Sequence, residues 1–224
     1  MKRAQEVRSA PRDWLVVLRA VYPFLTSREI GDLLLYGSQA LSVYLDNPLR
    51  SKDLDLVSSQ MGPRHLDALV EHLGGIEMLE IRSSTIQSRP RPLGKLTIYS
   101  VELRLEGKPF ILEIFDKVLD GQNPSILTPY TQQVHKWKLD LWVPSPDATV
   151  ALRLSFRQPE GISRLNAERL NSFIKQNRKK LNFHSVREII RRWGMDELVR
   201  SNLETLHKTH RMTIEGEPLL AGQK

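Results

Sequence analysis

Two aspartates, Asp53 and Asp55, stand one residue apart in an apolar segment and limit the possible folds more than any other feature of the chain. The segment from Asp53 to Val57 predicts a β-strand, in which successive side chains point to opposite faces. Both carboxylates therefore lie on one face and repel each other, and neither can be buried without compensation. A divalent cation supplies that compensation, and ligands that are all oxygen atoms suit Mg²⁺.

A glycine–serine pair precedes the two aspartates. Leu33 to Tyr36 predicts a short buried strand that ends in a tight turn at Gly37. Ser38 to Leu45 then predicts a helix, because its apolar residues recur at helical spacing. Backbone N–H groups at the start of a helix favour phosphate. A phosphate site beside a metal site indicates a nucleotide.

The remaining pattern predicts a mixed α/β domain over residues 1–145 and a small helical domain over residues 146–224. The first domain is expected to contain helices over 13–25 and 63–73, and strands over 76–81, 95–105, 109–116 and 139–143. The segment 83–94 is rich in proline and serine and predicts a mobile loop, and 120–130 is rich in turn residues. Ser145, Pro146 and Asp147 predict a helix start and hence the domain boundary. Further helices are expected over 148–156, 163–176, 184–193 and 195–210.

The composition excludes several classes of chemistry. There is no cysteine among the 224 residues, which rules out disulfides, thiolate metal sites and cysteine nucleophiles. The chain contains neither a Walker loop nor the Gly-x-Ser-x-Gly turn of serine hydrolases. Residues 1–12 are polar and no apolar run is long enough to span a membrane, so we expect a cytoplasmic protein without membrane contact.

The net charge of +7 is unevenly distributed. Between Arg153 and Met212 there are 14 Lys and Arg against 6 Asp and Glu, whereas the rest of the chain is close to neutral. This asymmetry indicates a surface for a polyanion such as RNA. Solvated faces of arginine-rich helices explain it equally well.

The segments from Leu35 to Leu41 and from Arg50 to Leu56 resemble the nucleotidyltransferase superfamily related to DNA polymerase beta. Within it, the Ala-Leu helix and the Arg-Ser-x-Asp-Leu-Asp segment are most similar to prokaryotic nucleotidyltransferases, which include toxins of toxin–antitoxin pairs. The resemblance implies a mixed sheet flanked by helices, followed by a small C-terminal helical domain. Fourteen residues separate Ser38 from Asp53, slightly more than is common in the family.

The resemblance also implies a third carboxylate on a strand beside the two aspartates. Glu113 is the expected residue, because an isolated acid in the apolar run Phe110–Phe115 is costly unless it is paired or bound to metal. Asp116 is the alternative, but its odd spacing from Glu113 places it on the opposite strand face. The superfamily more often has aspartate at this position.

The implied chemistry is nucleotidyl transfer with two Mg²⁺ ions, which would be held by Asp53, Asp55 and Glu113. An NTP is the implied substrate. Gly37 and Ser38 would then contact its phosphates. Further basic residues that would bind phosphate are Arg50, Lys52 and Arg153.

The expected function is Mg²⁺-dependent transfer of a nucleoside monophosphate, with ATP among the NTP candidates, to a hydroxyl. RNA, for example a tRNA end, is the preferred acceptor, bound by the basic C-terminal helices. The alternative is an inactive nucleotidyltransferase fold that acts as an RNA-binding or toxin–antitoxin partner. The sequence leaves the acceptor, the base and the oligomeric state open.

Overall fold

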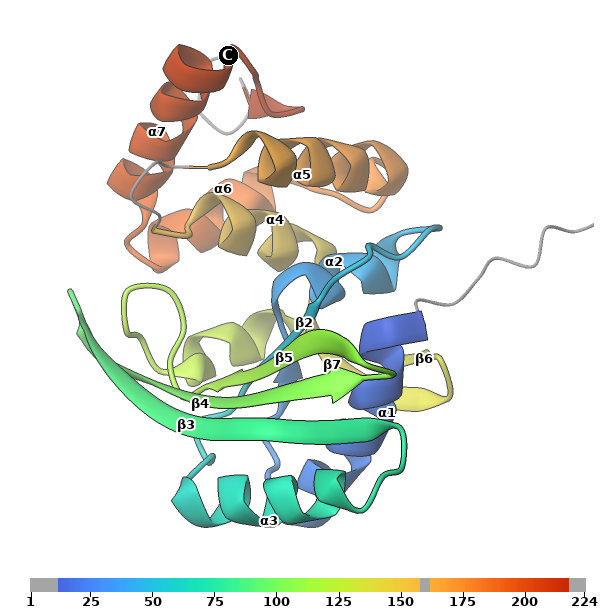
Figure 1. Cartoon of the computed structure of the whole chain (residues 1–224). Coiled ribbons are helices and arrows are strands. Elements are labelled where there is room, and N and C mark those ends of the chain that lie inside the picture. The colour runs from blue at the N-terminus through green and yellow to red at the C-terminus, as the bar shows by residue number, and fades with distance from the viewer. Residues whose placement is uncertain (1–11, 158–161, 218–224) are drawn as a thin grey trace, which may run out of the picture.

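The computed structural model describes residues 12–157 and 162–217. At its centre is a mixed five-stranded sheet with the strand order β1-β2-β5-β4-β3 (Figure 1). β2 and β5 are parallel, and the other neighbouring strands are antiparallel. The strands are β1 (Leu34–Leu35), β2 (Asp53–Val57), β3 (Leu79–Arg91), β4 (Gly94–Leu105) and β5 (Lys108–Phe115).

Two helices, α1 (Arg12–Ser27) and α3 (Pro63–Gly74), cover one face of this sheet (Figure 1). The strands present apolar side chains to them, and Leu54 and Leu112 are fully buried there. Proline in the first turn favours the start of α3, and the Gly-Gly pair at its end favours its termination. The apolar face of the sheet is therefore sealed, and the acidic face lies on the other side.

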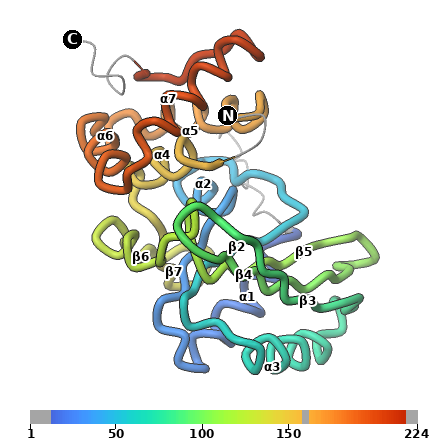
Figure 2. The backbone as a smooth tube through the Cα atoms, turned by 90° about the vertical axis from the view of Figure 1, so that its left-hand side faces the viewer, coloured from blue at the N-terminus to red at the C-terminus, as the bar shows by residue number. Residues whose placement is uncertain are grey.

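The helices near the acidic face are α2 (Gly37–Tyr44), α4 (Pro146–Leu154), α5 (Arg164–Asn177), α6 (Phe183–Arg192) and α7 (Asp196–Thr205). In Figure 2, α4, α5, α6 and α7 lie together on the side of α2 that is away from the sheet. Ser145, Ser163 and Asn182 each accept backbone N–H groups and cap α4, α5 and α6. A π-helical turn (Leu206–His210) extends α7. The expected C-terminal helices are thus confirmed.

The two halves of the chain share a hydrophobic core. Leu41 of α2 belongs to the same buried cluster as Leu152 of α4 and Phe173 of α5. The Tyr44 hydroxyl donates to the Pro144 carbonyl at 2.6 Å, which fixes α2 against the segment that enters α4. The expected boundary at residues 145 and 146 therefore coincides with a change of secondary structure inside a continuous core.

The expectation of a mobile loop over 83–94 is wrong. Residues up to Arg91 belong to β3 and pair with β4 in a long antiparallel hairpin. Because most residues from Ser84 to Pro90 are exposed on both faces of an edge strand, they lack the apolar–polar alternation that identifies strands. Pro90 is tolerated because an edge strand has a side that needs no hydrogen bonds.

Two smaller differences also concern strands. The sequence analysis missed β6 (Thr131–Lys136), a polar strand that pairs only with β7 (Leu139–Pro144) in a separate hairpin. The strand expected from residue 76 begins at Leu79. The turn-rich segment contains a 3₁₀ helix (Pro124–Tyr130), whose start is capped by Asn123.

Among the described residues, no helix combines the length and the apolar character that a membrane crossing requires. The expectation about polar residues near the N-terminus falls mainly on 1–11, which lie outside the described residues.

The shared core makes a prediction about unfolding. Leu41 is fully buried in it, so Leu41→Ala is expected to lower the free energy of unfolding by about 2–5 kcal/mol. Urea unfolding followed by circular dichroism and tryptophan fluorescence should show one transition for both probes. Leu165→Ala is the control, because Leu165 is 55% exposed and its loss should change stability by less than about 0.5 kcal/mol. Two separate transitions would show that the halves fold independently.

Candidate active site

The acidic face of the sheet brings together the three carboxylates singled out in the sequence. In the parallel pair β2–β5, Asp55 is directly opposite Glu113, and Asp53 is opposite Ile111. Residues opposite each other point to the same face, so all three acids lie on the side away from α1 and α3. Asp116, the alternative, lies beyond the end of β5, where its carboxylate accepts the Thr97 backbone N–H at 2.6 Å.

The turn between β1 and α2 lies directly against Asp55. Gly37 has a φ of +59°, a conformation that favours glycine. A Cβ atom on Gly37 would lie 1.9 Å from Oδ2 of Asp55. The Tyr36 backbone N–H donates to the Asp55 carbonyl at 3.0 Å. The Asp55 carboxylate and the N-terminal turn of α2 therefore adjoin each other, as a metal–phosphate site requires.

Asp53 is held by two polar side chains, Ser51 and Gln39, and Ser38 contacts the first of these. The Ser51 hydroxyl donates to the Asp53 carboxylate, and the Ser38 hydroxyl lies 3.3 Å from that of Ser51. Gln39 is fully buried, and its amide donates to the Asp53 carbonyl at 2.6 Å and to the Asp53 carboxylate at 3.2 Å. Its oxygen is 3.5 Å from the Asp55 backbone nitrogen. Gln39 thus links α2 to both aspartates.

Two of the acids, Asp55 and Glu113, have raised pKa values. Burial, then Asp53, then Glu113 raise the pKa of Asp55 to about 7, and Arg153 opposes the increase. Burial and Asp53 also raise the pKa of Glu113, and Arg89 opposes that increase. Arg153 and Arg89 therefore do not offset burial and the repulsion between carboxylates on this face of the sheet.

Hard oxygen donors in need of positive charge fit Mg²⁺ by their chemistry. Within residues 12–157 and 162–217, no three acidic, histidine or cysteine side chains are arranged as a closed metal-binding group. Asp53 is bonded to Ser51 and Gln39, and the Asp55 carboxylate lies against Gly37. The three carboxylates supply the oxygen ligands that Mg²⁺ prefers, and strand register places them on one face. Their side chains would have to rotate to bind one ion together.

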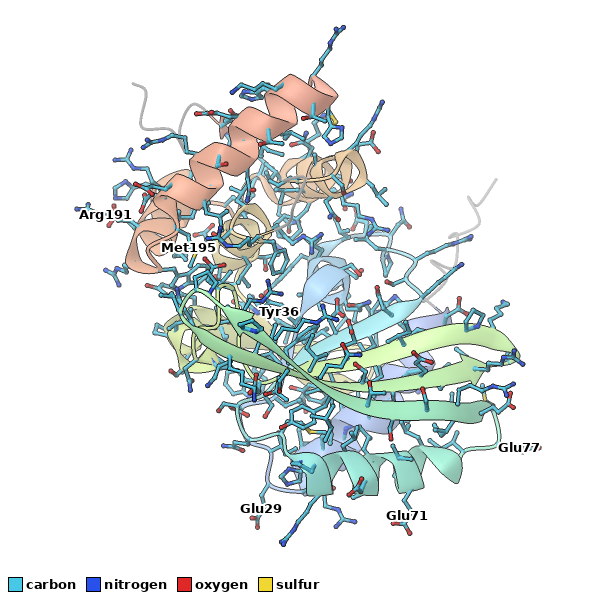
Figure 3. All side chains as sticks on the ribbon, turned by 60° about the vertical axis from the view of Figure 1, so that its left-hand side comes forward. Glu29, Tyr36, Glu71, Glu77, Arg191 and Met195 are labelled. Carbon is cyan, nitrogen blue, oxygen red and sulfur yellow. The ribbon has the colours of Figure 1, made fainter. Side chains whose placement is uncertain are left out.

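A cavity of about 230 Å³ adjoins Asp55. Four cationic side chains line it: Arg91, Lys117, Arg153 and Arg157. Its apolar and aromatic walls include Tyr36, Leu96, Phe115, Val118, Leu119 and Phe156. Figure 3 shows Tyr36 between the sheet and the helices. We call this space the cationic pocket, and its combination of guanidinium groups and aromatic rings suits a nucleotide.

Two buried polar atoms of the cationic pocket lack hydrogen-bond partners of good geometry, the Tyr36 hydroxyl and Nε of Arg91. Burial raises the pKa of Tyr36, although the backbone of Leu119 is close enough to oppose this. Both groups remain donors at neutral pH. An acceptor-rich ligand such as a phosphate would satisfy them.

Arg153 is the member of this pocket that the sequence anticipated. Its Nη2 donates to the Asn166 side chain at 2.8 Å, and its guanidinium lies 5.3 Å from the centre of the Phe156 ring. Burial lowers the pKa of Arg153, and Asp55 is the largest opposing influence. Arg153 therefore remains charged and faces the acids from α4.

Two of the residues expected to bind phosphate lie outside the cationic pocket. Arg50 and Lys52 are exposed on the approach to β2, and neither lines the cationic pocket. Lys52 lines a separate cavity of about 170 Å³ with Lys108. Arg157, which the sequence analysis missed, forms a two-pronged ion pair with buried Asp120, at 2.8 and 2.6 Å.

Arg91 was missed because it fell in the expected loop. Lys117 follows the end of β5 and carries no pattern of its own. Arg157 lies beyond the end of α4, so helical spacing from Arg153 gives no signal for it. Gln39 is a polar residue in a helix otherwise made of small and apolar side chains, and burial at such a position implies a hydrogen-bonding role.

No family model and no curated protein matches the sequence. Solved structures do match. The solution structure of the antibiotic-resistance factor ANT(2'')-Ia aligns with a TM-score of 0.52 at 13% identity, over 88% of this chain and 97% of that one. JHP933 from Helicobacter pylori aligns with a TM-score of 0.54 at 12% identity, over 95% of this chain and 89% of that one. This chain therefore has the fold of these two structures.

The close approach of Gly37 to Asp55 predicts that Gly37→Ala is strongly destabilising. The left-handed backbone costs a non-glycine residue about 1–2 kcal/mol, and the added Cβ would in addition displace the Asp55 side chain. Gly31→Ala is the matched control, since a Cβ there meets nothing within 4 Å. Thermal unfolding of both variants tests this expectation. Equal melting temperatures for the two variants would contradict it.

The raised pKa of Asp55 predicts a pH-dependent stability. Aspartate in the unfolded chain has a pKa of about 3.9, whereas the pKa of folded Asp55 is about 7. Between these values the folded state binds more protons, so without divalent cations stability falls as pH rises from about 4 to about 7. Asp55→Asn should remove this part of the decrease and exceed the wild type by about 1–3 kcal/mol at pH 8.

Urea unfolding in EDTA at pH 5 and pH 8 measures this difference. Addition of Mg²⁺ at pH 8 should stabilise the wild type and leave Asp55→Asn nearly unchanged, because cation binding favours the charged carboxylate. A wild-type and variant difference that does not change with pH would show that Asp55 has an ordinary pKa.

Proposed function

We propose that this protein is a Mg²⁺-dependent nucleotidyltransferase that moves a nucleoside monophosphate from an NTP to a hydroxyl group. The observation that carries the proposal is the placement of the acidic row Asp53, Asp55 and Glu113 beside the cationic pocket and under the start of α2. Acids alone would indicate a metal, and cations alone would indicate an anion. Asp55 belongs to the acidic row and also lines the cationic pocket, and this juxtaposition of acids and cations favours a metal-bound triphosphate.

Asp53, Asp55 and Glu113 would hold the metal. Bound Mg²⁺ lowers the pKa of an attacking hydroxyl and stabilises the pyrophosphate that leaves. Gln39 and Ser51 orient Asp53, so they keep its carboxylate directed at the site. Gly37 leaves the backbone of the α2 turn open to the triphosphate.

The cationic pocket would bind and orient the nucleotide. Arg91, Lys117 and Arg153 supply positive charge to the phosphates, and the Tyr36 hydroxyl is a further donor. The base would lie against the aromatic walls. In the reaction the acceptor oxygen forms a bond to the α-phosphorus, and the bond between the α-phosphorus and the bridging oxygen breaks. Pyrophosphate leaves, and the hydroxyl proton passes to solvent beside Glu113, which is less buried than Asp55.

The acceptor hydroxyl would approach from the side of Glu113, because the cationic pocket takes the side of Asp55. We favour RNA as the acceptor, for example a tRNA end, in keeping with the basic charge of the chain. ATP is the first NTP to test. The alternative, an inactive fold that binds RNA or a toxin–antitoxin partner, requires none of the metal chemistry.

Replacement of the acids should separate these possibilities. Asp53→Asn, Asp55→Asn and Glu113→Gln are each expected to lower the transfer rate by more than the ~100-fold that loss of an outer-shell group costs. Gln39→Leu should cost about 10–100-fold, since it acts through Asp53. The measurement is transfer of label from each α-labelled NTP to total RNA in the presence of Mg²⁺.

Asp116→Asn is the matched control and should retain activity, because Asp116 is bound to the Thr97 backbone. Full activity in Asp53→Asn or Asp55→Asn would refute the assigned roles. No transfer by the wild type, together with no Mg²⁺-dependent NTP binding in calorimetry, would favour the inactive alternative.

A further inference from the structure

The outer half of the β3–β4 hairpin, residues 84–97, has no role in the site described so far except for Arg91 and Leu96. We call these residues the ribbon. β3 is the edge strand of the sheet and pairs only with β4. Nearly all ribbon residues are exposed, including Ile86 at 46% and Leu93 at 60%. The outer end of the hairpin curves toward the helical half of the molecule (Figure 1).

Strand register connects the ribbon directly to the carboxylates. Thr85 is opposite Ser100 on β4, Ser100 is opposite Glu113 on β5, and Glu113 is opposite Asp55 on β2. These four residues form one row across the sheet and point to the same face. Neighbouring strands are about 4.8 Å apart, so Thr85 lies about 14 Å from Asp55.

From Thr85 outward, every second residue of β3 faces the same side as the acids. These residues are Thr85, Gln87, Arg89 and Arg91, all of which carry hydrogen-bond donors. Arg91 turns into the cationic pocket. Arg89 is exposed and donates to Gln87 at 2.9 Å, and its charge is felt at Glu113. A row of hydrogen-bond donors therefore extends along β3 from Thr85 to Arg91, on the same face as the carboxylates.

The charge of the hairpin changes along its length. Its inner half carries two acids and two bases, Glu80, Arg82, Glu102 and Arg104. These partly neutralise one another, since Arg82 and Glu80 form a salt bridge at 2.9 Å and Ser83 donates to Glu102. The ribbon carries Arg89, Arg91 and Lys95 and no acid. In the part of the chain that the structure describes, no salt bridge involves these three residues.

We propose that the ribbon binds the phosphate backbone of an RNA strand whose terminal hydroxyl lies at Glu113. Exposed guanidinium and ammonium groups interleaved with serine, threonine and glutamine side chains are the groups that contact phosphates and 2′-hydroxyls. An anionic polymer is attracted here, whereas a polycationic acceptor is repelled. The role as acceptor rests on the proposed function, but the RNA contact itself does not require catalysis.

The ribbon differs from the surface that the sequence indicated, which was the basic C-terminal helices. Those helices gather more charge, but register places the ribbon on the carboxylate face itself. The two surfaces make different predictions for matched variants.

The test uses the full chain and a fluorescent single-stranded RNA with a free 3′ end. Arg89→Gln combined with Lys95→Gln removes two ribbon charges. Arg82→Gln combined with Arg104→Gln removes two charges from the inner half of the same hairpin. Each single-strand phosphate contact contributes about 0.7 to the slope of log affinity against log salt. The ribbon variant should therefore lose about 1.4 from this slope and bind roughly tenfold more weakly at 0.1 M salt, while the inner variant keeps the wild-type slope.

At saturating Mg²⁺, calorimetric binding of ATP should be the same in both variants, because none of the four replaced residues lines the cationic pocket. Equal RNA affinity of the two variants would overturn the ribbon proposal and leave the proposed function untouched. No RNA binding by the wild type would overturn both the ribbon proposal and RNA as the acceptor, but not nucleotidyl transfer to another hydroxyl. Poly-glutamate that displaces the RNA at equal charge concentration would also overturn it, in favour of an acidic polypeptide. Loss of RNA binding in the ribbon variant alone, in a protein that transfers no nucleotide, would support the ribbon and refute the proposed function.

Discussion

The mutual repulsion of three carboxylates held on neighbouring parallel strands is the constraint on which the rest of the site depends. Apolar residues alternate with the acids along β2 and β5, and they are buried against α1 and α3. Their burial fixes the register that places Asp55 opposite Glu113. The acids cannot separate unless those side chains leave the core. The fold therefore keeps these like charges close together. Their repulsion, with burial, raises the pKa values of Asp55 and Glu113.

The cationic side chains that line the pocket beside these carboxylates come from both halves of the chain. Arg153 and Arg157 belong to α4 and the segment after it, whereas Arg91 comes from β3 and Lys117 follows β5. The core that joins α2 to α4 and α5 sets the distance between these groups. Two of the four cationic side chains of the pocket, Arg153 and Arg157, come from beyond the boundary at residue 145, so the pocket is built from both sides of that boundary.

The sequence predicted the acids because their signal is local. An Asp-x-Asp strand and one acid in an apolar run report a strand face directly, and a glycine before a helix reports the turn at Gly37. Pairing with β4 decided the structure of 83–94 and overrode a composition typical of loops. Arg91 and Lys117 were therefore invisible as site residues, since their neighbours in space are remote along the chain. Arg50 and Lys52 illustrate the converse, because proximity in sequence to Asp53 did not bring them into the cationic pocket.

The corrected strand also changes how the site divides its positive charge. Arg91 lines the cationic pocket, and Arg89, two residues earlier on the same face, remains exposed and within electrostatic reach of Glu113. A two-residue step along one strand thus separates a cation of the pocket from a cation near Glu113. A flexible loop could not keep these groups distinct, whereas a paired strand fixes their order. Under the proposed function, the pleat of β3 would therefore keep the nucleotide side of the site apart from the acceptor side.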